Sequence, residues 1–265
     1  MFYDIIVVGA GGTGGNLLKE LGRFLKFFHV PDRDWNLTII DGDTVEARNG
    51  ERQPFFEGDV QQMKALCIQE GLVDCIGLPA ENVAAYPIYL DSAEWLRNKM
   101  DKQNQSVSIV VGCVDNHRAR QVLHEVFNKD QGNIIYIDSA NEFDYGEVVV
   151  GVKMKGKEIC PPRAYYFPEV LTDTSPSASE LSCGAINVSS PQHLITNLVA
   201  AGHILSTIIG IMQEGRVDGG IIHFNAFTHF SRFDKWVEKE TEQKSKTKRK
   251  RTVKKGDDSD GRKTS

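Results

Sequence analysis

An apolar run that ends in a cluster of glycines constrains the fold of this chain more than any other feature. Residues 4–9 read Asp-Ile-Ile-Val-Val-Gly, residues 9–14 match G-x-G-x-x-G, and apolar side chains then recur at helical spacing over 13–28. A short apolar run bounded by glycine is typical of a buried parallel strand. Because glycines permit a tight turn and let a phosphate approach a helix N-terminus, this order predicts a nucleotide-binding βα unit. The motif alone does not distinguish NAD, FAD and ATP.

The remainder of the first half repeats the alternation of strand and helix. Further strands are expected near 37–41, 83–89, 107–114 and 133–138, with helices over 59–71, 92–103 and 116–129. This rhythm predicts an α/β fold with a doubly wound, mostly parallel sheet of the Rossmann type. Ligands bind such sheets at the carboxyl ends of the strands, so the site is expected there.

The second half has a different pattern. Its expected elements are an edge or hairpin strand over 147–153, an irregular segment over about 157–190, an apolar helix over 191–213, and a closing antiparallel hairpin from 219–225 and 227–233. A long segment without periodicity inside a domain is usually functional or mobile. We therefore expect one domain over 1–234.

Charge separates this domain from the end of the chain. The whole chain carries 31 basic and 36 acidic residues, whereas residues 235–265 carry 12 and 6, so an acidic body precedes a basic tail. The tail has too few apolar residues to form a core and is expected to be disordered. It either solubilises the protein or contacts an acidic partner or nucleic acid. The acidic body argues against a protein that binds nucleic acid throughout.

The cysteines and the N-terminus bear on the compartment. Five cysteines stand far apart and are odd in number, which is untypical of a disulfide framework. The first residues lack the pattern of a signal peptide, and no uninterrupted apolar run has the length of a membrane span. These features predict a cytoplasmic protein without a membrane partner.

Polar residues that follow the second strand indicate which nucleotide is bound. Asp41 ends that strand, where a carboxylate can hold the ribose hydroxyls. The stretch that follows supplies further carboxylate, amide and cationic side chains, namely Asp43, Asn49, Arg52, Gln53 and Lys64. A triphosphate needs such cations, and arginine can contact phosphate through two N–H groups. Asp115, at the end of another strand, is suited to Mg²⁺ together with phosphate oxygens. The pattern therefore favours Mg·ATP.

The sequence resembles the ThiF, MoeB and ubiquitin-activating enzyme family (UBA/THIF type). The matching motifs are the glycine loop, D-x-D-T-V at 41–45, N-x-x-R-Q at 49–53, Lys64, V-x-C-x-D-N at 111–116, and Cys183 before a proline and a long helix. A weaker resemblance is to ThiF-family proteins of bacterial plasmids and integrated elements (PRTRC type). The family resemblance implies an adenylyltransferase that uses ATP and Mg²⁺ to activate the C-terminal glycine of a small ubiquitin-like or sulfur-carrier protein.

The resemblance also implies roles for individual residues. The nucleotide pocket would be formed by Gly9, Gly11, Gly12, Gly14, Asp41, Asp43, Asn49, Arg52, Gln53 and Lys64. The catalytic set would be Arg52, Lys64 and Asp115, with Asp115 as the Mg²⁺ ligand. Cys183 would be the crossover-loop cysteine that receives or attacks the activated acyl group; the alternative is a structural thiol.

The chain departs from the family in two respects. It begins at the first strand, without the N-terminal helix whose arginine reaches the partner subunit's nucleotide in many members; Arg48 could supply a charge from within. It also lacks paired C-x-x-C motifs, so no structural zinc is expected. The alternatives to adenylation are an NAD(P)- or FAD-dependent oxidoreductase and a scaffold with reduced catalysis. Apolar segments at 24–28, 54–56 and 191–213 predict a homodimer.

Overall fold

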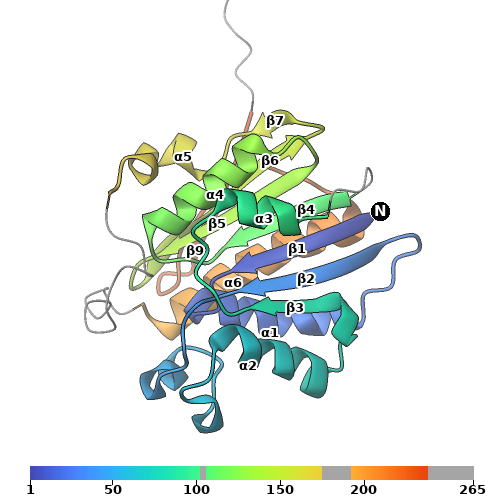
Figure 1. Ribbon diagram of the computed structural model, residues 1–265. Coiled ribbons are helices and arrows are strands. Elements are labelled where there is room, and N and C mark those ends of the chain that lie inside the picture. Colours follow the sequence, from blue (N-terminus) through green and yellow to red (C-terminus); the bar gives the residue numbers. More distant parts are fainter. Residues whose placement is uncertain (102–105, 175–191, 238–265) are drawn as a thin grey trace, which may run out of the picture.

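A single mixed β-sheet with helices on both faces forms the body of the protein. The computed structural model describes residues 1–101, 106–174 and 192–237. In these residues the strand order is β3-β2-β1-β4-β5-β6-β8-β9, and β7 pairs with β6 beside this path. Figure 1 shows the strands crossing the centre of the molecule between the two helical layers. The predicted α/β fold is confirmed.

Five adjacent strands are parallel, and they form the half of the sheet that carries the glycine loop. They are β1 (Phe2–Val8), β2 (Asp34–Ile40), β3 (Val83–Tyr86), β4 (Ser106–Gly112) and β5 (Ile134–Asn141). Val8 is in register with Ile40 on one side and with Gly112 on the other. The central strands therefore end at the same level, and their carboxyl ends lie together at one edge of the sheet, as the sequence predicted.

The other four strands are antiparallel. They are β6 (Tyr145–Met154), β7 (Lys157–Cys160), β8 (Gly220–Asn225) and β9 (Phe230–Lys235). The expected closing hairpin is β8–β9. β6 does form a hairpin with β5, but it is not an edge strand, because β8 pairs along its other side. Its residues Val148–Val152 are buried on both faces, which accounts for their continuous apolar character.

Two groups of helices cover opposite faces of the sheet (Figure 1). The inner sides of α1 (Gly12–Lys26), α2 (Lys64–Glu70) and α6 (Leu194–Ile209) contribute to one apolar cluster. The second cluster lies beneath α3 (Ala93–Lys99) and α4 (His117–Lys129). The predicted helices are therefore present, and they cover both faces of the sheet, as in a doubly wound fold.

The helix α6 continues as a π-helical turn over Gly210–Glu214. By length and composition, Leu194–Glu214 is apolar enough to cross a membrane, with a mean hydropathy of 1.8 in its most apolar window. Its inner side nevertheless packs on α1 and the sheet, where Ala200, Ile204 and Ile208 are fully buried. The apolar composition of α6 is therefore explained, for one side of the helix, by its packing in the core.

Short helical turns complete the described chain. They are 3₁₀ turns at Ala47–Glu51, Glu57–Asp59, Ala80–Asn82 and Pro168–Leu171, a π-helical turn at Gly71–Ile76, and the short helix α5 (Arg163–Tyr166). The helix expected over 59–71 therefore begins only at Lys64. The segment expected to be irregular from 157 contains β7, α5 and a 3₁₀ turn as far as Leu171. Cys183 and the basic tail beyond residue 237 lie outside the described residues.

Arg163 anchors the segment that contains α5 through buried ion pairs that sequence reasoning missed. Its Nε lies 3.1 Å from Asp138 Oδ1 and its Nη1 lies 3.0 Å from Glu147 Oε1. Arg120 from α4 approaches the same Asp138 oxygen at 3.3 Å, and Tyr136 donates its hydroxyl proton to the other oxygen. Because a buried carboxylate requires such partners, these contacts hold α5 against the sheet.

Candidate nucleotide-binding site

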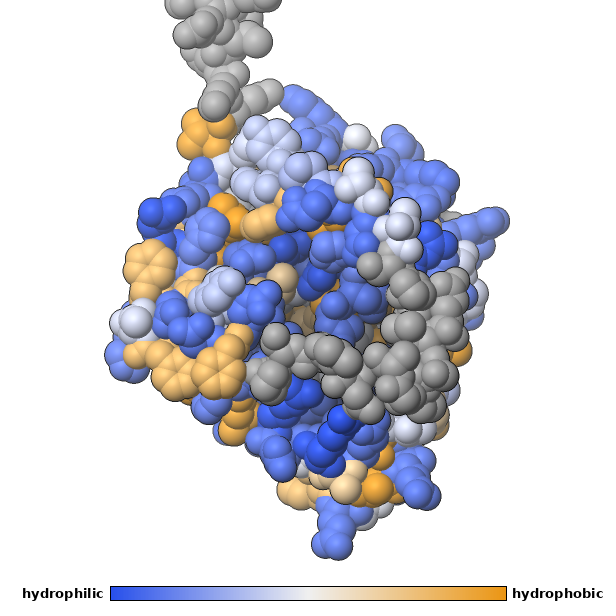
Figure 2. Space-filling model, turned by 90° about the vertical axis from the view of Figure 1, so that its left-hand side faces the viewer, coloured by the Kyte–Doolittle hydropathy of each residue, from blue (hydrophilic) through white to orange (hydrophobic). Residues whose placement is uncertain are grey.

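A cavity opens at the carboxyl ends of the parallel strands. Its wall is formed by the loops that follow β1, β2, β3 and β4, together with the end of β5 and the start of α6. Figure 2 views this edge of the sheet and shows a hollow lined with hydrophilic side chains, with apolar side chains gathered to one side. The cavity therefore lies where the strand order predicts a ligand site.

The glycine loop forms the floor of the cavity, and its glycines have different functions. Gly9 has a φ of +93°, in the left-handed region. Gly11, whose φ is −78°, has nothing within 4 Å of the position that a β-carbon would occupy. A β-carbon on Gly14 would lie 1.8 Å from the carbonyl oxygen of Gly9. Gly9, Gly11 and Gly12 line the cavity, whereas Gly14 lets α1 approach the loop.

Asp41 fastens the end of β2 to this loop. One carboxylate oxygen accepts a hydrogen bond from the backbone N–H of Ala10 at 2.6 Å, and the other accepts from that of Asp43 at 2.8 Å. Burial raises the pKa of Asp41, and the positive charge of Lys64 partly opposes this rise. Asp41 lines the cavity beside the glycine loop, which is the position that a ribose-binding carboxylate requires.

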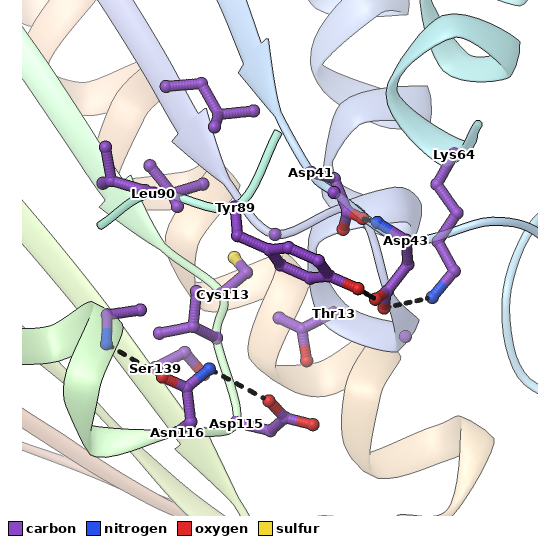
Figure 3. Close-up of a pocket in the computed structure, with 18 of the residues that line it drawn as sticks. Thr13, Asp41, Asp43, Lys64, Tyr89, Leu90, Cys113, Asp115, Asn116 and Ser139 are labelled. Atoms are coloured by element: carbon purple, nitrogen blue, oxygen red, sulfur yellow. Dashed lines mark hydrogen bonds and ion pairs between the residues drawn. The ribbon is translucent and has the colours of Figure 1, made fainter. Parts of the chain in front are cut away.

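Lys64, Asp43 and Tyr89 form a connected group on the next part of the wall (Figure 3). Lys64 begins α2 and is only 6% exposed, and its Nζ lies 3.0 Å from Asp43 Oδ2. Tyr89 donates its hydroxyl proton to the other Asp43 oxygen at 2.7 Å. Asp43 therefore holds the buried ammonium in place. Sequence reasoning missed Tyr89, because it comes from a loop after β3 that only the fold brings to the site.

Arg52 and Gln53 also line the cavity, but Asn49 does not. The Asn49 side chain is buried, and its oxygen accepts the backbone N–H of Glu46 at 2.8 Å, which closes the 3₁₀ turn. Its predicted role in phosphate binding stays a prediction. Arg48 is paired with Glu46 at 2.6 Å and is outside the cavity lining. Arg118, in the first turn of α4, is a further cation on the wall that the sequence did not single out.

Asp115 lies in the loop after β4, which runs beside the glycine loop, and it lines the cavity. Asn116 caps α4 by accepting the N–H of Ala119 at 2.8 Å, and its amide nitrogen lies 3.5 Å from Asp115 Oδ1 (Figure 3). The cap fixes the backbone that carries Asp115, and the carboxylate remains available at the cavity. No group of three or more His, Cys, Asp or Glu side chains in the described residues could hold a metal. A single carboxylate fits Mg²⁺ bound mainly by phosphate oxygens and water.

Uncharged polar side chains from β5, from α6 and from the residues just before α6 form another part of the wall. Asn141 Nδ2 donates to Thr13 Oγ1 at 2.7 Å and lies 3.3 Å from Asn197 Oδ1. Ser139 donates its hydroxyl proton to Asn141 Oδ1 at 3.0 Å. Gln192 Nε2 donates to the carbonyl oxygen of Asn141 at 3.0 Å. We call the part that carries Arg52 and Lys64, with Asp43 paired to Lys64, the cationic wall, and the part formed by Ser139, Asn141, Gln192 and Asn197 the amide wall.

Two of the described cysteines, Cys113 and Cys160, are poorly suited to act as nucleophiles. Cys113 touches the cavity, but burial raises its thiol pKa far above the ordinary range. Burial also raises the pKa of Cys160 to about 12. Since the thiolate is the nucleophile, neither is suited to attack an acyl group. The predicted role of Cys183 lies outside the described residues.

Fold and site together define an E1-like adenylation domain, a nucleotide-binding α/β unit. The model of the ThiF family matches residues 2–247, and this chain belongs to that family. It is 27% identical over 135 residues to ubiquitin-like modifier-activating enzyme 5 of Oryza sativa subsp. japonica, covering 48% of this chain and 30% of the rice protein.

Solved structures show the same fold at low sequence identity. Escherichia coli MccB with ATP has a TM-score of 0.61 and 15% identity, covering 90% of this chain and 65% of MccB. MccB with MccA-N7isoAsn gives a TM-score of 0.62 at 15% identity, over 90% and 66%. PaaA gives 0.60 at 15%, over 88% of this chain and 64% of PaaA. The chain therefore spans just under two thirds of MccB and PaaA, and less than a third of the rice enzyme.

Proposed function

We propose that this protein uses Mg·ATP to adenylate the C-terminal carboxyl group of a small ubiquitin-like or sulfur-carrier protein. The observation that carries the proposal is the meeting of Arg52, Lys64 and Asp115 around one cavity floored by the glycine loop. A nicotinamide or flavin does not require a wall with two cationic side chains together with a carboxylate suited to Mg²⁺. ThiF membership and this wall favour adenylation over the oxidoreductase alternative.

Each wall has a task in this reaction. The glycine loop and Asp41 bind the nucleoside, and Arg52 and Lys64 neutralise phosphate charge as it increases in the transition state. Asp115 would hold Mg²⁺, which supplies further positive charge to the leaving pyrophosphate. An acceptor carboxylate oxygen forms a bond to the α-phosphorus, the bond from that phosphorus to the β-phosphate bridging oxygen breaks, and pyrophosphate leaves.

The nature of the acceptor is part of the proposal. The rice relative is named as an activator of ubiquitin-like modifiers, and MccB is named as a microcin C7 biosynthetic enzyme in complex with N-formylated MccA. Incubating the chain with Mg·ATP and candidate ubiquitin-fold proteins should give acceptor-dependent ATP–pyrophosphate exchange and an AMP adduct by mass spectrometry. Nucleotide binding without exchange for any acceptor would contradict adenylation and favour the scaffold. Reduction of a nicotinamide would favour the oxidoreductase.

We also infer that Cys183 acts only after adenylation. Neither Cys113 nor Cys160 is suited to react with the activated acyl group, because the pKa of each thiol is raised. Replacing Cys183 by serine should preserve acceptor-driven pyrophosphate exchange and abolish any thiol-sensitive covalent adduct. Loss of exchange in the variant would contradict this division of steps.

A homodimer is the proposed assembly. The outer side of α6 presents Leu194, Ile195 and Leu198, each about 40% exposed, in a stripe at helical spacing. An exposed apolar stripe of this kind is typical of a subunit interface. Light scattering at tens of micromolar, where interfaces of micromolar affinity are occupied, should give twice the chain mass. A monomer under these conditions would contradict the proposal.

A further inference from the structure

An exposed aromatic surface adjoins the amide wall of the cavity. Phe143, from the β5–β6 turn, and Phe227, from the β8–β9 turn, are 51% and 50% exposed. Their rings are nearly parallel, with centroids 6.0 Å apart. The ring of His193, at the start of α6, meets both edge-on, at 5.6 Å and 5.1 Å. We call Phe143, His193 and Phe227 the aromatic platform.

Hydrogen bonds fix the platform before any partner arrives. The carbonyl oxygen of Phe143 accepts the hydroxyl proton of Thr196 at 2.6 Å. The carbonyl oxygen of Asp144 accepts the N–H of Ala226 at 2.7 Å, which ties the two turns together. An exposed aromatic pair on a rigid base costs little side-chain entropy on binding, as is typical of binding hot spots.

The platform residues follow closely, along the chain, on residues of the amide wall. Phe143 and His193 lie two and one residues beyond Asn141 and Gln192, which are on the amide wall. Figure 2 shows apolar side chains grouped at one side of the hollow. A chain lying on the platform could therefore enter the cavity along the amide wall, away from the cationic wall.

The amide wall contains a donor that still needs a partner. Asn197 is fully buried, and in the described part of the chain its Nδ2 makes no hydrogen bond. This nitrogen lies beside Gly12, 2.1 Å from where a β-carbon on that residue would be. An unsatisfied buried amide donor is costly, so it points to a ligand acceptor such as a peptide carbonyl or carboxylate.

The negative charge near the platform favours a partner segment that carries positive charge. Glu142 is exposed beside Phe143, and the chain up to residue 234 has an excess of acidic residues. A partner segment with a basic residue next to its apolar one would match this rim.

We propose that the aromatic platform and the amide wall bind the C-terminal segment of the acceptor, and that they select a bulky apolar side chain flanked by a basic residue upstream of the C-terminal glycine. This proposal rests on the proposed function, because it assumes that the acceptor enters the same cavity. The amide side chains can both donate hydrogen bonds to an extended peptide backbone and accept them from it, while the platform contacts one side chain of the peptide.

Synthetic peptides of about ten residues that end in Gly-Gly provide the test. One series carries a Phe-Lys pair at successive positions, and the matched series carries Ser-Ser instead. We expect at least one Phe-Lys peptide to bind the Mg·ATP-loaded chain about tenfold more tightly than its Ser-Ser counterpart, as measured by fluorescence anisotropy. Phe227→Ser should remove this preference and leave Mg·ATP affinity unchanged.

Phe27→Ser is the matched control. Phe27 is 79% exposed just after α1, at the opposite edge of the sheet, and its loss should leave the preference intact. Asn197→Leu should weaken all peptides of both series alike, because it removes a backbone contact. Equal binding of the two series, absence of peptide binding, or a preference that survives Phe227→Ser would overturn the platform assignment.

Two further readouts separate the competing explanations. A peptide preference without pyrophosphate exchange would retain the platform and contradict adenylation. Exchange that is indifferent to the Phe-Lys pair would retain adenylation and contradict the platform. If Phe227→Ser instead converts a dimer into a monomer, the platform is a subunit interface and the proposal is wrong.

Discussion

Gly14 lies so close to Gly9 that a β-carbon on Gly14 would be 1.8 Å from the carbonyl oxygen of Gly9. Gly11, three residues before Gly14 in the same motif, has open space at the corresponding position. The two glycines therefore have different functions. Gly14 permits α1 to pack closely on the glycine loop, and Gly11 leaves space for a ligand at the cavity floor.

Alanine at each position should separate these purposes. Gly14→Ala should lower the free energy of unfolding by about 3 kcal/mol or more, because the loop must move to accept the methyl group. Gly11→Ala should leave stability nearly unchanged and weaken Mg·ATP binding at least about tenfold. Urea unfolding and calorimetric titration measure the two effects. A destabilised Gly11→Ala with normal nucleotide affinity would contradict the assignment.

Asp115→Ala should remove the anionic metal ligand and leave the glycine loop intact. Nucleotide binding should partly survive, while acceptor-dependent pyrophosphate exchange should fall about 10³-fold, the scale typical of losing a positioned electrostatic group. Asp74→Ala, an exposed carboxylate on the π-helical turn, is the control and should exchange at the parent rate. If Asp115→Ala also exchanges at that rate, Asp115 does not hold the metal.

Lys153 caps the C-terminus of α4 from inside the protein. Its Nζ is bonded to the carbonyl oxygens of Phe127 at 2.5 Å and Asn128 at 2.8 Å, and burial lowers its pKa. Lys153→Met leaves these carbonyls without their donor and should cost about 1–3 kcal/mol of stability in urea unfolding. Lys155→Met, at an exposed position two residues on, should change stability by less than about 0.5 kcal/mol. Equal effects would show that the cap does not stabilise α4.

The pH dependence of stability should reveal His203. Burial lowers the pKa of this side chain, which packs on Phe224 with ring centroids 5.4 Å apart. In the unfolded chain a histidine titrates near pH ~6.5, so below that pH the unfolded state takes up a proton that the folded state resists. This contribution is therefore complete above ~6.5 and is lost as the pH falls.

His203→Gln should reduce that loss. At pH ~5.5 the histidine can account for at most about 1.4 kcal/mol, which sets the upper limit of the difference between parent and variant. Urea unfolding at pH 5.5 and 7.5 measures it. His124, whose pKa is also lowered by burial, should leave a remaining dependence in the variant. An identical pH profile for parent and variant would exclude His203 as a contributor.

Local patterns in the sequence determined much of the fold. The apolar runs of β1, β2, β4 and β5, the helical spacing after Gly11, and the glycine motif itself are local features, and each predicted its element. Because the carboxyl ends of parallel strands meet at one edge, these elements alone placed the cavity beside Asp41 and Asp115. The residue types of the ThiF motifs added an expected ligand, Mg·ATP.

Only the tertiary structure decided which side chains meet across long separations. Tyr89 reaches Asp43, Asn197 reaches the glycine loop and Arg163 reaches Asp138, and no periodicity connects the members of these pairs. Likewise, a continuous apolar run could not show whether β6 lay at an edge or inside the sheet, because that depends on where β8 returns. Such contacts depend on how distant segments pack, whereas local patterns report only how each segment folds and which of its faces is buried.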